Sequence, residues 1–536
     1  MLDLVFVGGE VIDGTGRPGI RADLGVRDGR IAAIGDLSGV ECRERVDARG
    51  KVVCPGFIDM HTHSDLTLLV NPRAESMVHQ GVTTLVVGNC GMGVAPVRPE
   101  LRGPLRQAFA FLTGDVEWTW ESFASYLDCL AAARPSVNVG ALVSHGAARA
   151  HVMGFDEREA SPEERSAITA TIRQAMDEGA LGVSTGLIYN PSMFADTEEL
   201  VAVSRAAAEA NGVYTTHMRH EGVQLMEAVE EALEVARRSG ARTQICHLKA
   251  SGKAAWGRAA EAAERIRQAR EEGNDIAFDL YPYTAGSTML STLLPQWALR
   301  GTTDEIVARL RDPAAIARLL HELRHGGSGY HSGLGAPPYE WERVLITSVG
   351  SEMNRGFEGK EMPEVARMMG ATPEEAFLRL LVDDHLQVNM VIHSQCEEDM
   401  RGLLKHPLAL VITDGLAFAP YGPLGRGRPH PRSYGTFPRF LGRYVRDEGL
   451  HSLEEGIRRV TSGPAARMGI TDRGILREGL AADIVVFDPA AIRDTATYTE
   501  PHQYPEGIDL VVVNGEIVVR DGEHTGAGPG QVLRKK

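Results

Sequence analysis

The sequence predicts an α/β fold in which a closed (β/α)8 barrel, the TIM barrel, carries a small β-sandwich domain formed from both chain termini. Two patterns predict this fold. Through the middle of the chain, short apolar runs alternate with helical stretches, as they do in parallel βαβ units. Both ends instead carry short β-prone runs punctuated by Gly and Asp. We therefore expect the β-sandwich domain over residues 1–54 and 475–536 and the barrel over residues 55–474.

The terminal strands follow from runs of similar type at the two ends of the chain. LVFVGGEVID and ADLGVRDGRIAAIG stand near the start, and ADIVVFDP and DLVVVNGEIVVRDG stand near the end. Asn514 and Gly515 form a pair that tolerates the left-handed backbone conformation, which a tight hairpin turn needs. We expect one hairpin there and a domain that joins the two ends.

Eight runs are candidates for the barrel strands: FIDMHTH, TTLVVGNC, VNVGALVSHG, LGVSTGL, VYTTHMRH, RTQICHLK, DIAFDLYPY and LALVITDG. Helical patterns lie between them. One begins at Ser161 with Pro162 and acidic residues in its first turn, and it stops at Gly179. Another ends at Gly240. Closing eight such units in a ring places the chemistry at the C-terminal ends of the strands.

Two further apolar runs, RVLITSVG and NMVIHSQ, do not fit in the ring of eight, and we assign them to an insertion and to a sheet edge. The segment at about 285–343 is long, polar and rich in glycine. Long segments of this kind in compact enzymes often act as lids over a binding site. We expect a lid over the barrel mouth here.

Composition excludes several classes of function. The 72 acidic residues exceed the 56 basic ones, and a net charge of −16 disfavours binding to nucleic acid or to anionic membranes. No apolar run is long enough to span a membrane, and the start lacks the features of a signal peptide. The six cysteines have no paired spacing, so we expect reduced thiols and a cytoplasmic protein. The sequence does not decide between a monomer and a homo-oligomer.

Six side chains that can bind a metal lie where predicted barrel strands end: His61, His63, Cys90, His217, His247 and Asp414. His61 and His63 are two residues apart, so the period of a strand puts both imidazoles on the same face. Each of the six alone has a structural explanation, but six donors on one rim predict a metal centre. Thiolate and imidazole ligands favour Zn²⁺, and the carboxylate admits a second, weaker site.

Three neighbouring residues are less decisive. His145 closes the third predicted strand, where it could hydrogen-bond the oxyanion or a metal ligand. His220 follows His217 by three positions, so it supports the site from behind or is structural. Cys246 is adjacent to His247, and we expect it to face away from the metal into the core.

The sequence resembles the amidohydrolase superfamily across nearly its whole length, through FIDMHTHSD after VVCPG, the distal VITDG and the C-terminal GLAADIVVFDP. More narrowly, GNCGMG, STGLIYNPS, THMRHEG, DLYPYTAGST and HPRSYGTFPRFLG are similar to the N-acyl-D-amino acid deacylases, or D-aminoacylases. This resemblance implies a zinc-dependent hydrolase that uses a metal-activated water. Its small-molecule substrate would be an N-acyl-D-amino acid, which it would split into a carboxylate and a free D-amino acid.

The resemblance also implies roles for individual residues. One tightly bound zinc would be held by Cys90, His217 and His247, and a second, weaker position by His61, His63 and Asp414. Asp414 would be the general base, and the clamp on the substrate carboxylate would consist of Arg432, Lys249 and either Tyr281 or Tyr283. Many relatives bridge two metals with a carboxylated lysine on the fourth strand. LGVSTGL contains no lysine, and a Cys90 bridge fits that absence.

Two other functions remain open at this stage. A cyclic amidohydrolase of the dihydropyrimidinase or hydantoinase type would use the same barrel, although the missing lysine, GNCGMG and HPR count against it. A non-catalytic barrel that serves as an assembly module is the other alternative, but such proteins usually lose metal ligands. The sequence leaves open the preferred acyl group and side chain, and it does not establish D-selectivity independently of the resemblance.

Overall fold

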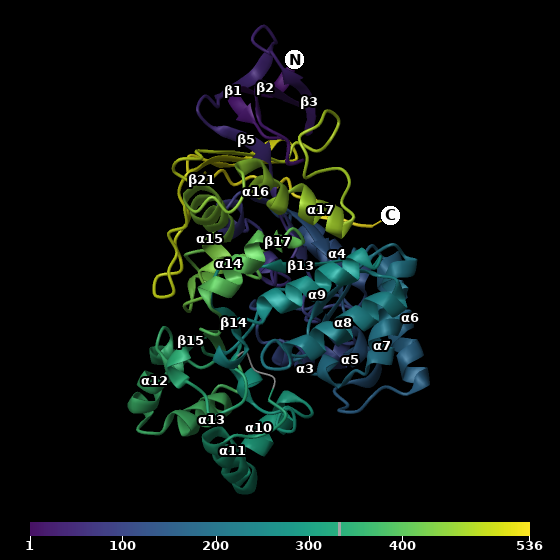
Figure 1. Ribbon diagram of the computed structural model, residues 1–536, viewed down its shortest axis with the longest axis vertical. Helices are drawn as coiled ribbons and strands as arrows, with labels where there is room; N and C mark the ends of the chain where they lie inside the picture. Colours follow the sequence, from purple (N-terminus) through teal and green to yellow (C-terminus); the bar gives the residue numbers. More distant parts are fainter. Residues whose placement is uncertain (331–333, 536) are drawn as a thin grey trace.

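The computed structural model describes residues 1–330 and 334–535, and in it strands from both chain ends form one nine-stranded sheet. Its strands are β1 (Leu2–Val11), β2 (Ile20–Arg27), β3 (Arg30–Gly35), β4 (Cys42–Asp47), β5 (Val52–Pro55), β18 (Ile484–Phe487), β19 (Ile508–Val513), β20 (Glu516–Arg520) and β21 (Glu523–His524). β5 pairs with both β1 and β18, which joins the two ends of the chain (Figure 1). The prediction that both termini build one small β domain is confirmed.

The predicted hairpin near the C-terminus is also present. β19 pairs with β20 in antiparallel fashion across Asn514 and Gly515. Both turn residues have positive φ angles, 48° and 83°, as a tight two-residue turn requires.

Parallel strands at the centre of the molecule follow the predicted barrel. They are β6 (Phe57–Asp59), β7 (Val82–Val87), β8 (Asn138–Ala141) with its continuation β9 (Val143–Ser144), β10 (Gly182–Gly186), β11 (Val213–His217), β12 (Arg242–Ile245), β13 (Ile276–Leu280) and β17 (Ala409–Val411). Each pairs in parallel with the next, and a parallel bridge between Thr62 and Gly415 joins the last strand to the first. All eight predicted strand runs occupy the ring. β22 (Val532–Leu533), from the C-terminal tail, also pairs with β8.

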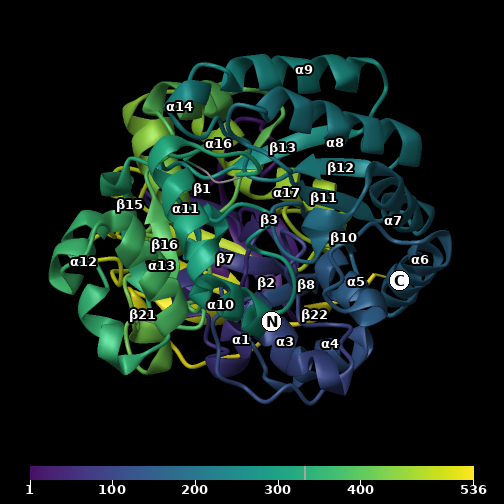
Figure 2. The same cartoon turned by 90° about the horizontal axis from the view of Figure 1, so that it is seen from below.

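Helices surround the ring, as Figure 2 shows most clearly for α4 to α9. The longer ones are α4 (Phe123–Ala132), α5 (His145–Met153), α6 (Pro162–Asp177), α7 (Thr197–Glu209), α8 (Leu225–Ser239), α9 (Ala259–Glu271), α14 (Glu397–Lys405), α15 (Arg432–Arg439) and α16 (Leu453–Val460). The shorter ones are α1 (Thr67–Val70), α2 (Glu75–Val78), α3 (Arg102–Ala108) and α17 (Ser462–Met468). α6 begins in a capping box between Ser161 and Glu164, and α8 ends at the left-handed Gly240, as the sequence predicted.

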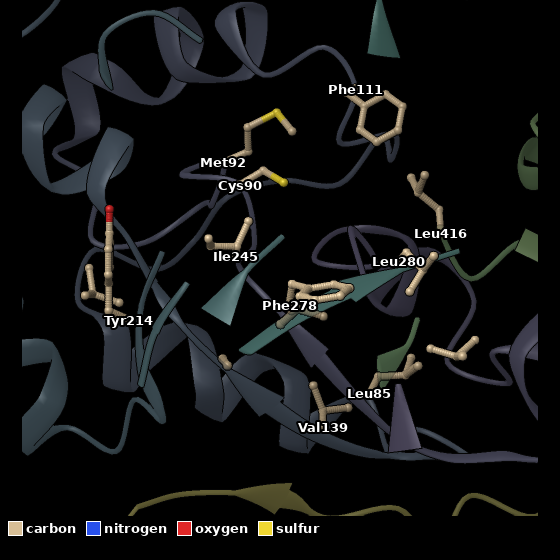
Figure 3. Close-up of a cluster of buried hydrophobic side chains, with 14 of the residues drawn as sticks. Leu85, Cys90, Met92, Phe111, Val139, Tyr214, Ile245, Phe278, Leu280 and Leu416 are labelled. Carbon is tan, nitrogen blue, oxygen red and sulfur yellow. The ribbon is translucent and has the colours of Figure 1, made fainter. Parts of the chain in front are cut away.

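The main core fills the space between strands and helices. It includes Leu85, Val139, Ile245 and Phe278 from neighbouring barrel strands, all with almost no exposed surface (Figure 3). Cys90 belongs to the same cluster. A close-packed interior of this kind holds the strand ends, and the side chains they carry, in fixed positions.

A separate unit is inserted between β13 and β17. It consists of a three-stranded antiparallel sheet of β14 (Gly286–Met289), β16 (Asn389–Ile392) and β15 (Val344–Ser348), with α10 (Thr303–Arg311), α11 (Pro313–His325), α12 (Met362–Met369) and α13 (Pro373–Asp383). It has its own apolar core and lies at the end of the molecule away from the terminal sheet (Figure 1). The unit runs on to Ile392, past the position 343 at which the predicted lid ends, and residues 331–333 of that segment lie outside the described residues.

The run NMVIHSQ is not an edge strand, contrary to the sequence-based assignment. β16 is the central strand of the inserted sheet, because it pairs with β14 on one side and β15 on the other. In the part of the chain that the structure describes, no helix is both long enough and apolar enough to cross a lipid bilayer.

Candidate metal centre and active site

The C-terminal ends of the barrel strands bring all six predicted donor residues together. One buried group contains His61, His63, Cys90 and Asp414, and a second contains Cys90, His217 and His247. Within each group, the candidate ligand atoms lie within 4.8 Å of one another. Cys90 is common to both groups, so its sulfur lies within reach of both candidate sites.

The first group is formed where β6 and β17 end. His61 Nε2 lies 3.2 Å from Cys90 Sγ and 3.3 Å from Asp414 Oδ1. His63 Nε2 lies 3.1 Å from the same Asp414 oxygen. The two imidazole centroids are 5.5 Å apart, so both side chains point into the same space. This is the arrangement that the two-residue spacing of the histidines predicted.

The second group depends on β11 and β12. Cys90 Sγ lies 3.4 Å from His247 Nε2, and the His217 and His247 rings meet edge to face with centroids 4.4 Å apart. Both His217 ring nitrogens are buried and have no hydrogen-bond partner among the described residues. Burial lowers the pKa of both imidazoles well below the ordinary value, which keeps them in the neutral form that binds metals. These donors fit a zinc ion in number and in chemical type.

Three of the six donors have left-handed backbone conformations. The φ angles are 52° at Cys90, 36° at His247 and 50° at Asp414. Such values are uncommon for residues other than glycine, although aspartate and histidine adopt them more readily than cysteine, and a left-handed residue of this kind costs on the order of 1–3 kcal/mol. Backbone strain of this kind concentrates at functional sites, where the surrounding structure holds it in place. It turns the side chains toward one another at the points where their strands end.

The Cys90 loop is held against β10 by Ser184. The Ser184 hydroxyl accepts a hydrogen bond from the Gly91 amide at 3.1 Å and donates one to the Gly88 carbonyl at 2.5 Å. Ser144 donates to the Gly91 carbonyl at 2.5 Å. A Cβ atom at Gly91 would lie only 2.4 Å from the backbone nitrogen of Gly186, so the approach of the loop to β10 requires glycine.

Two acidic residues that the sequence analysis missed support the ligands. Asp279 Oδ1 accepts a hydrogen bond from the His247 amide at 2.7 Å and lies 3.5 Å from His61 Nδ1. Glu221 Oε1 lies 2.9 Å from His247 Nδ1. A signal for Asp279 was present, because an acid within the apolar strand run IAFDL indicates an inward-facing position. Glu221 lies in the loop between β11 and α8, where no strand or helix periodicity could have predicted the direction of its side chain.

The predicted clamp residues lie around a small cavity of about 50 Å³ beside the donors, and Tyr281, Lys249 and Arg432 line it. Arg432 Nη1 lies 2.7 Å from Asp414 Oδ2, and its guanidinium is 4.8 Å from the centre of the Tyr281 ring. Lys249 Nζ lies 2.6 Å from Glu221 Oε1 and 2.8 Å from His247 Nδ1. Tyr283 is not in this cavity wall, and its ring packs against Arg439 instead.

Asp414 is surrounded by positive charge. Burial by itself raises the pKa of its carboxyl group, but the charge of Arg432, together with His61, outweighs that effect and holds the pKa well below the ordinary value. The group is therefore an ionised carboxylate at neutral pH. A carboxylate in contact with two candidate metal ligands can accept a proton from a nucleophile bound between them.

His145 and His220 lie outside the cavity beside the donors. Both ring nitrogens of His145 are engaged, with Ser192 Oγ at 3.0 Å and Glu199 Oε1 at 2.7 Å. Arg149 also pairs with Glu199, so His145 belongs to a buried structural network. His220 Nδ1 accepts a hydrogen bond from the Gly222 amide at 3.0 Å, and its side chain lines a separate cleft outside the donor groups.

Cys246 does not face away from the donors, so that expectation was wrong. Its sulfur is buried within 4.8 Å of ligand atoms of His61 and Asp279. The alternation of a strand does not apply here, because β12 ends at Ile245 and His247 adopts a left-handed conformation. Two consecutive side chains can therefore turn to the same side.

Comparisons with known proteins agree with this geometry. A model of the family described as "Amidohydrolase family" matches residues 44–519. The D-aminoacylase of Alcaligenes xylosoxydans xylosoxydans is 37% identical over 99% of this chain and 98% of its own length.

Solved structures extend the comparison. An N-acyl-D-glutamate deacylase from Bordetella bronchiseptica, in complex with zinc and a phosphonate mimic of the tetrahedral intermediate, is 35% identical with a TM-score of 0.85, and all of both chains is covered. A D-aminoacylase with a binuclear metal centre, showing one-metal activation and second-metal attenuation, is 36% identical with a TM-score of 0.83 over all of both chains. An L-hydantoinase from Arthrobacter aurescens, at 19% identity and a TM-score of 0.54 over all of both chains, shares the fold alone.

Proposed function

The chain belongs to the amidohydrolase family, and from that premise we propose that it removes the acyl group from N-acyl-D-amino acids in a zinc-dependent hydrolysis. The products are a carboxylate and a free D-amino acid. The observation that carries the proposal is the pair of donor groups that share Cys90. The chain that holds them is similar over its full length to a D-aminoacylase and to an N-acyl-D-glutamate deacylase.

The tightly bound zinc is assigned to Cys90, His217 and His247, and a second, weaker position to His61, His63 and Asp414. The orphaned nitrogens of His217 and the neutral state of His217 and His247 support the first assignment. When bound, zinc polarises the amide carbonyl and makes water a nucleophile at neutral pH.

Asp414 carries the proton in this scheme. It accepts a proton as the water oxygen adds to the acyl carbon, and it delivers that proton to the amine nitrogen as the C–N bond breaks. Arg432 holds Asp414 in its ionised form, because their side chains lie 2.7 Å apart. The proton is thus taken up and given back by one group, and no other base is required.

The free carboxylate of the substrate is assigned to Arg432, Lys249 and Tyr281, which share the wall of the cavity beside the donors. Arg432 offers a planar fork that matches a carboxylate, and Lys249 offers a point charge. Tyr281 is preferred to Tyr283 because Tyr281 lines that wall, whereas the Tyr283 ring packs against Arg439. The inserted unit, which supplies Ser287 and Thr288 to the same wall, is assigned the role of a lid.

The experiment that tests the proposal offers the zinc-loaded protein a panel of N-acetyl-D- and N-acetyl-L-amino acids, with hydantoin and dihydrouracil alongside. We expect release of free amine from the D-series and no ring opening. Ring opening without release of amine would favour a cyclic amidohydrolase, and inactivity on every compound with zinc bound would favour a non-catalytic barrel.

A further inference from the structure

The cavity beside the donors is too small to hold a whole N-acyl amino acid. Its volume of about 50 Å³ accommodates only a few water molecules. The substrate must therefore extend into neighbouring space. A second cavity of about 50 Å³ shares Ile188, Tyr189 and Thr292 with the first, and its walls include Met289, Leu299 and Ile306. This second cavity therefore suits a small apolar group of the substrate.

The other neighbouring cavity is much larger, at about 450 Å³, which is within the range of small-molecule sites. It shares Phe111, Ser287 and Arg432 with the cavity beside the donors. We call it the arginine chamber, because its walls contain five arginines against the two acids Asp115 and Glu358: Arg106, Arg355, Arg426, Arg428 and Arg432. This excess of positive charge stands out in a chain with a net charge of −16.

Three of these arginines have acidic partners close by. Arg106 lies 3.5 Å from Asp115, Arg355 lies 2.5 Å from Glu352, and Arg432 pairs with Asp414. Arg426 and Arg428 are exposed, and neither side chain has an ion pair within 4.0 Å among residues 1–330 and 334–535. Two guanidinium groups in the chamber are thus available to a ligand.

Of the two acids in the chamber walls, Asp115 pairs with Arg106, and Glu358 is shared among several arginines. It is half-buried, its Oε1 accepts the Val349 amide at 3.2 Å, and the charges of Arg355, Arg428 and Arg426 all act on it. One carboxylate therefore faces three guanidinium groups. Apolar side chains, among them Phe111, Leu112, Leu416 and Phe418, complete the chamber and can pack against the carbon atoms of a ligand.

We propose that the arginine chamber binds a second carboxylate of the substrate through Arg426 and Arg428, so that the preferred substrates are N-acyl-D-amino acids with two negative charges. This inference rests on the proposed deacylase function. The second carboxylate can come from an acidic side chain or from a dicarboxylic acyl group. Arginine recognises both in the same way, through charge-assisted hydrogen bonds to a planar carboxylate.

The test compares three substrates, which are N-acetyl-D-leucine with one charge, N-acetyl-D-glutamate with an acidic side chain, and N-succinyl-D-leucine with an acidic acyl group. The measured quantity is the ratio of kcat/KM for each doubly charged substrate to kcat/KM for N-acetyl-D-leucine. In the variant Arg426→Gln/Arg428→Gln we expect this ratio to fall about 10–100-fold for one of the two, which identifies the source of the carboxylate.

The matched control is Arg21→Gln/Arg27→Gln on β2, which removes the same charge from two exposed arginines of the terminal sheet. We expect its substrate ratios to equal those of the unmodified protein. An unchanged ratio for both dianions in the chamber variant would overturn the inference, and so would an equal fall in the control, because it would reflect net charge alone. If the protein hydrolyses N-acetyl-D-leucine but the chamber variant shows no change in ratio, only the chamber proposal fails and the deacylase function stands. If the unmodified protein hydrolyses none of the acylated substrates, the deacylase function and the chamber proposal both fail.

Discussion

At the scale of single residues, Cys90 is the residue on which the metal centre depends most. It is common to both donor groups, and its φ angle of 52° places its sulfur between them. Asp414 and His247 have similar left-handed conformations. Strain at three ligands in different segments indicates that the barrel imposes their positions, since an isolated strand end would relax to an ordinary conformation.

Cys90→Ala should therefore remove zinc from both positions and abolish hydrolysis. The matched control is Cys54→Ala, because Cys54 on β5 is an equally buried thiol that belongs to none of the donor groups. Zinc content measured by elemental mass spectrometry should fall in the first variant and persist in the second. Equal loss in both variants, or full occupancy in Cys90→Ala, would contradict the assignment of Cys90.

Asp414→Asn should retain the zinc held by Cys90, His217 and His247 but lose most of the rate. The amide has nearly the size of the carboxylate and cannot carry the proton, so kcat should fall by about 10²–10⁴-fold. Steady-state kinetics and zinc analysis on the same sample separate the two effects. A melting temperature should be recorded as well, because Arg432 loses its 2.7 Å ion-pair partner. A kcat close to that of the unmodified protein would rule out Asp414 as the base.

At the scale of elements, the short strand β10 positions the Cys90 loop. Ser184 lies on the fourth barrel strand, in the run LGVSTGL, which contains no lysine. Its hydroxyl bonds to the backbone on both sides of Cys90, at Gly88 and Gly91. The fourth strand thus fixes the loop that carries Cys90.

Ser184→Ala should weaken zinc binding about 10–100-fold, as is typical when a group that orients a ligand is removed. Ser204→Ala is the matched control, because its buried hydroxyl on α7 has no hydrogen-bond partner in the described part of the chain. Competition with a chromophoric chelator measures the affinity. A cobalt-loaded sample should also show an altered sulfur-to-metal charge-transfer band in Ser184→Ala alone. Identical affinities for both variants would remove Ser184 from the role of positioning residue.

At the scale of the whole molecule, the donors belong to the barrel, whereas the walls of the cavity beside them also come from the inserted unit. Ser287, Thr292 and Met390 reach that cavity from the insertion. The insertion has its own apolar core, separate from the main one. The proposed metal binding and the proposed enclosure of the substrate therefore fall to different parts of the chain.

Deleting residues 287–391 should leave a zinc-binding barrel with crippled turnover. Gly286 and Ile392 are paired residues on β14 and β16, so their Cα atoms lie about 5 Å apart and a Gly-Gly link can join the stumps. We expect zinc content and the far-ultraviolet dichroism of the remaining chain to persist, and kcat/KM for N-acetyl-D-leucine to fall at least about 100-fold, as misplacement of a substrate by an ångström already can do. Unchanged kinetics would exclude a lid.

The sequence by itself determined the elements and the identities of the donors. The eight strand runs, the hairpin at Asn514 and Gly515 and the caps at Ser161 and Gly240 are local signals, because the residues that decide them are neighbours in the chain. The donors could be named for the same reason, since parallel strands bring their C-terminal ends to one rim whatever the details of packing. The inserted sheet was less accessible, because the partners of β16 lie far from it in sequence.

Only the tertiary structure decided which polar groups meet. Side chains from different segments of the chain meet at distances that no periodic pattern encodes: Lys249 with Glu221, Cys246 beside His61, and His145 with Glu199. The arginine chamber is the clearest case, because Arg355, Arg426 and Arg428 come from an insertion and from a loop beyond the last barrel strand. Periodicity fixes where a strand ends, but the direction a side chain takes beyond that end depends on contacts between distant segments.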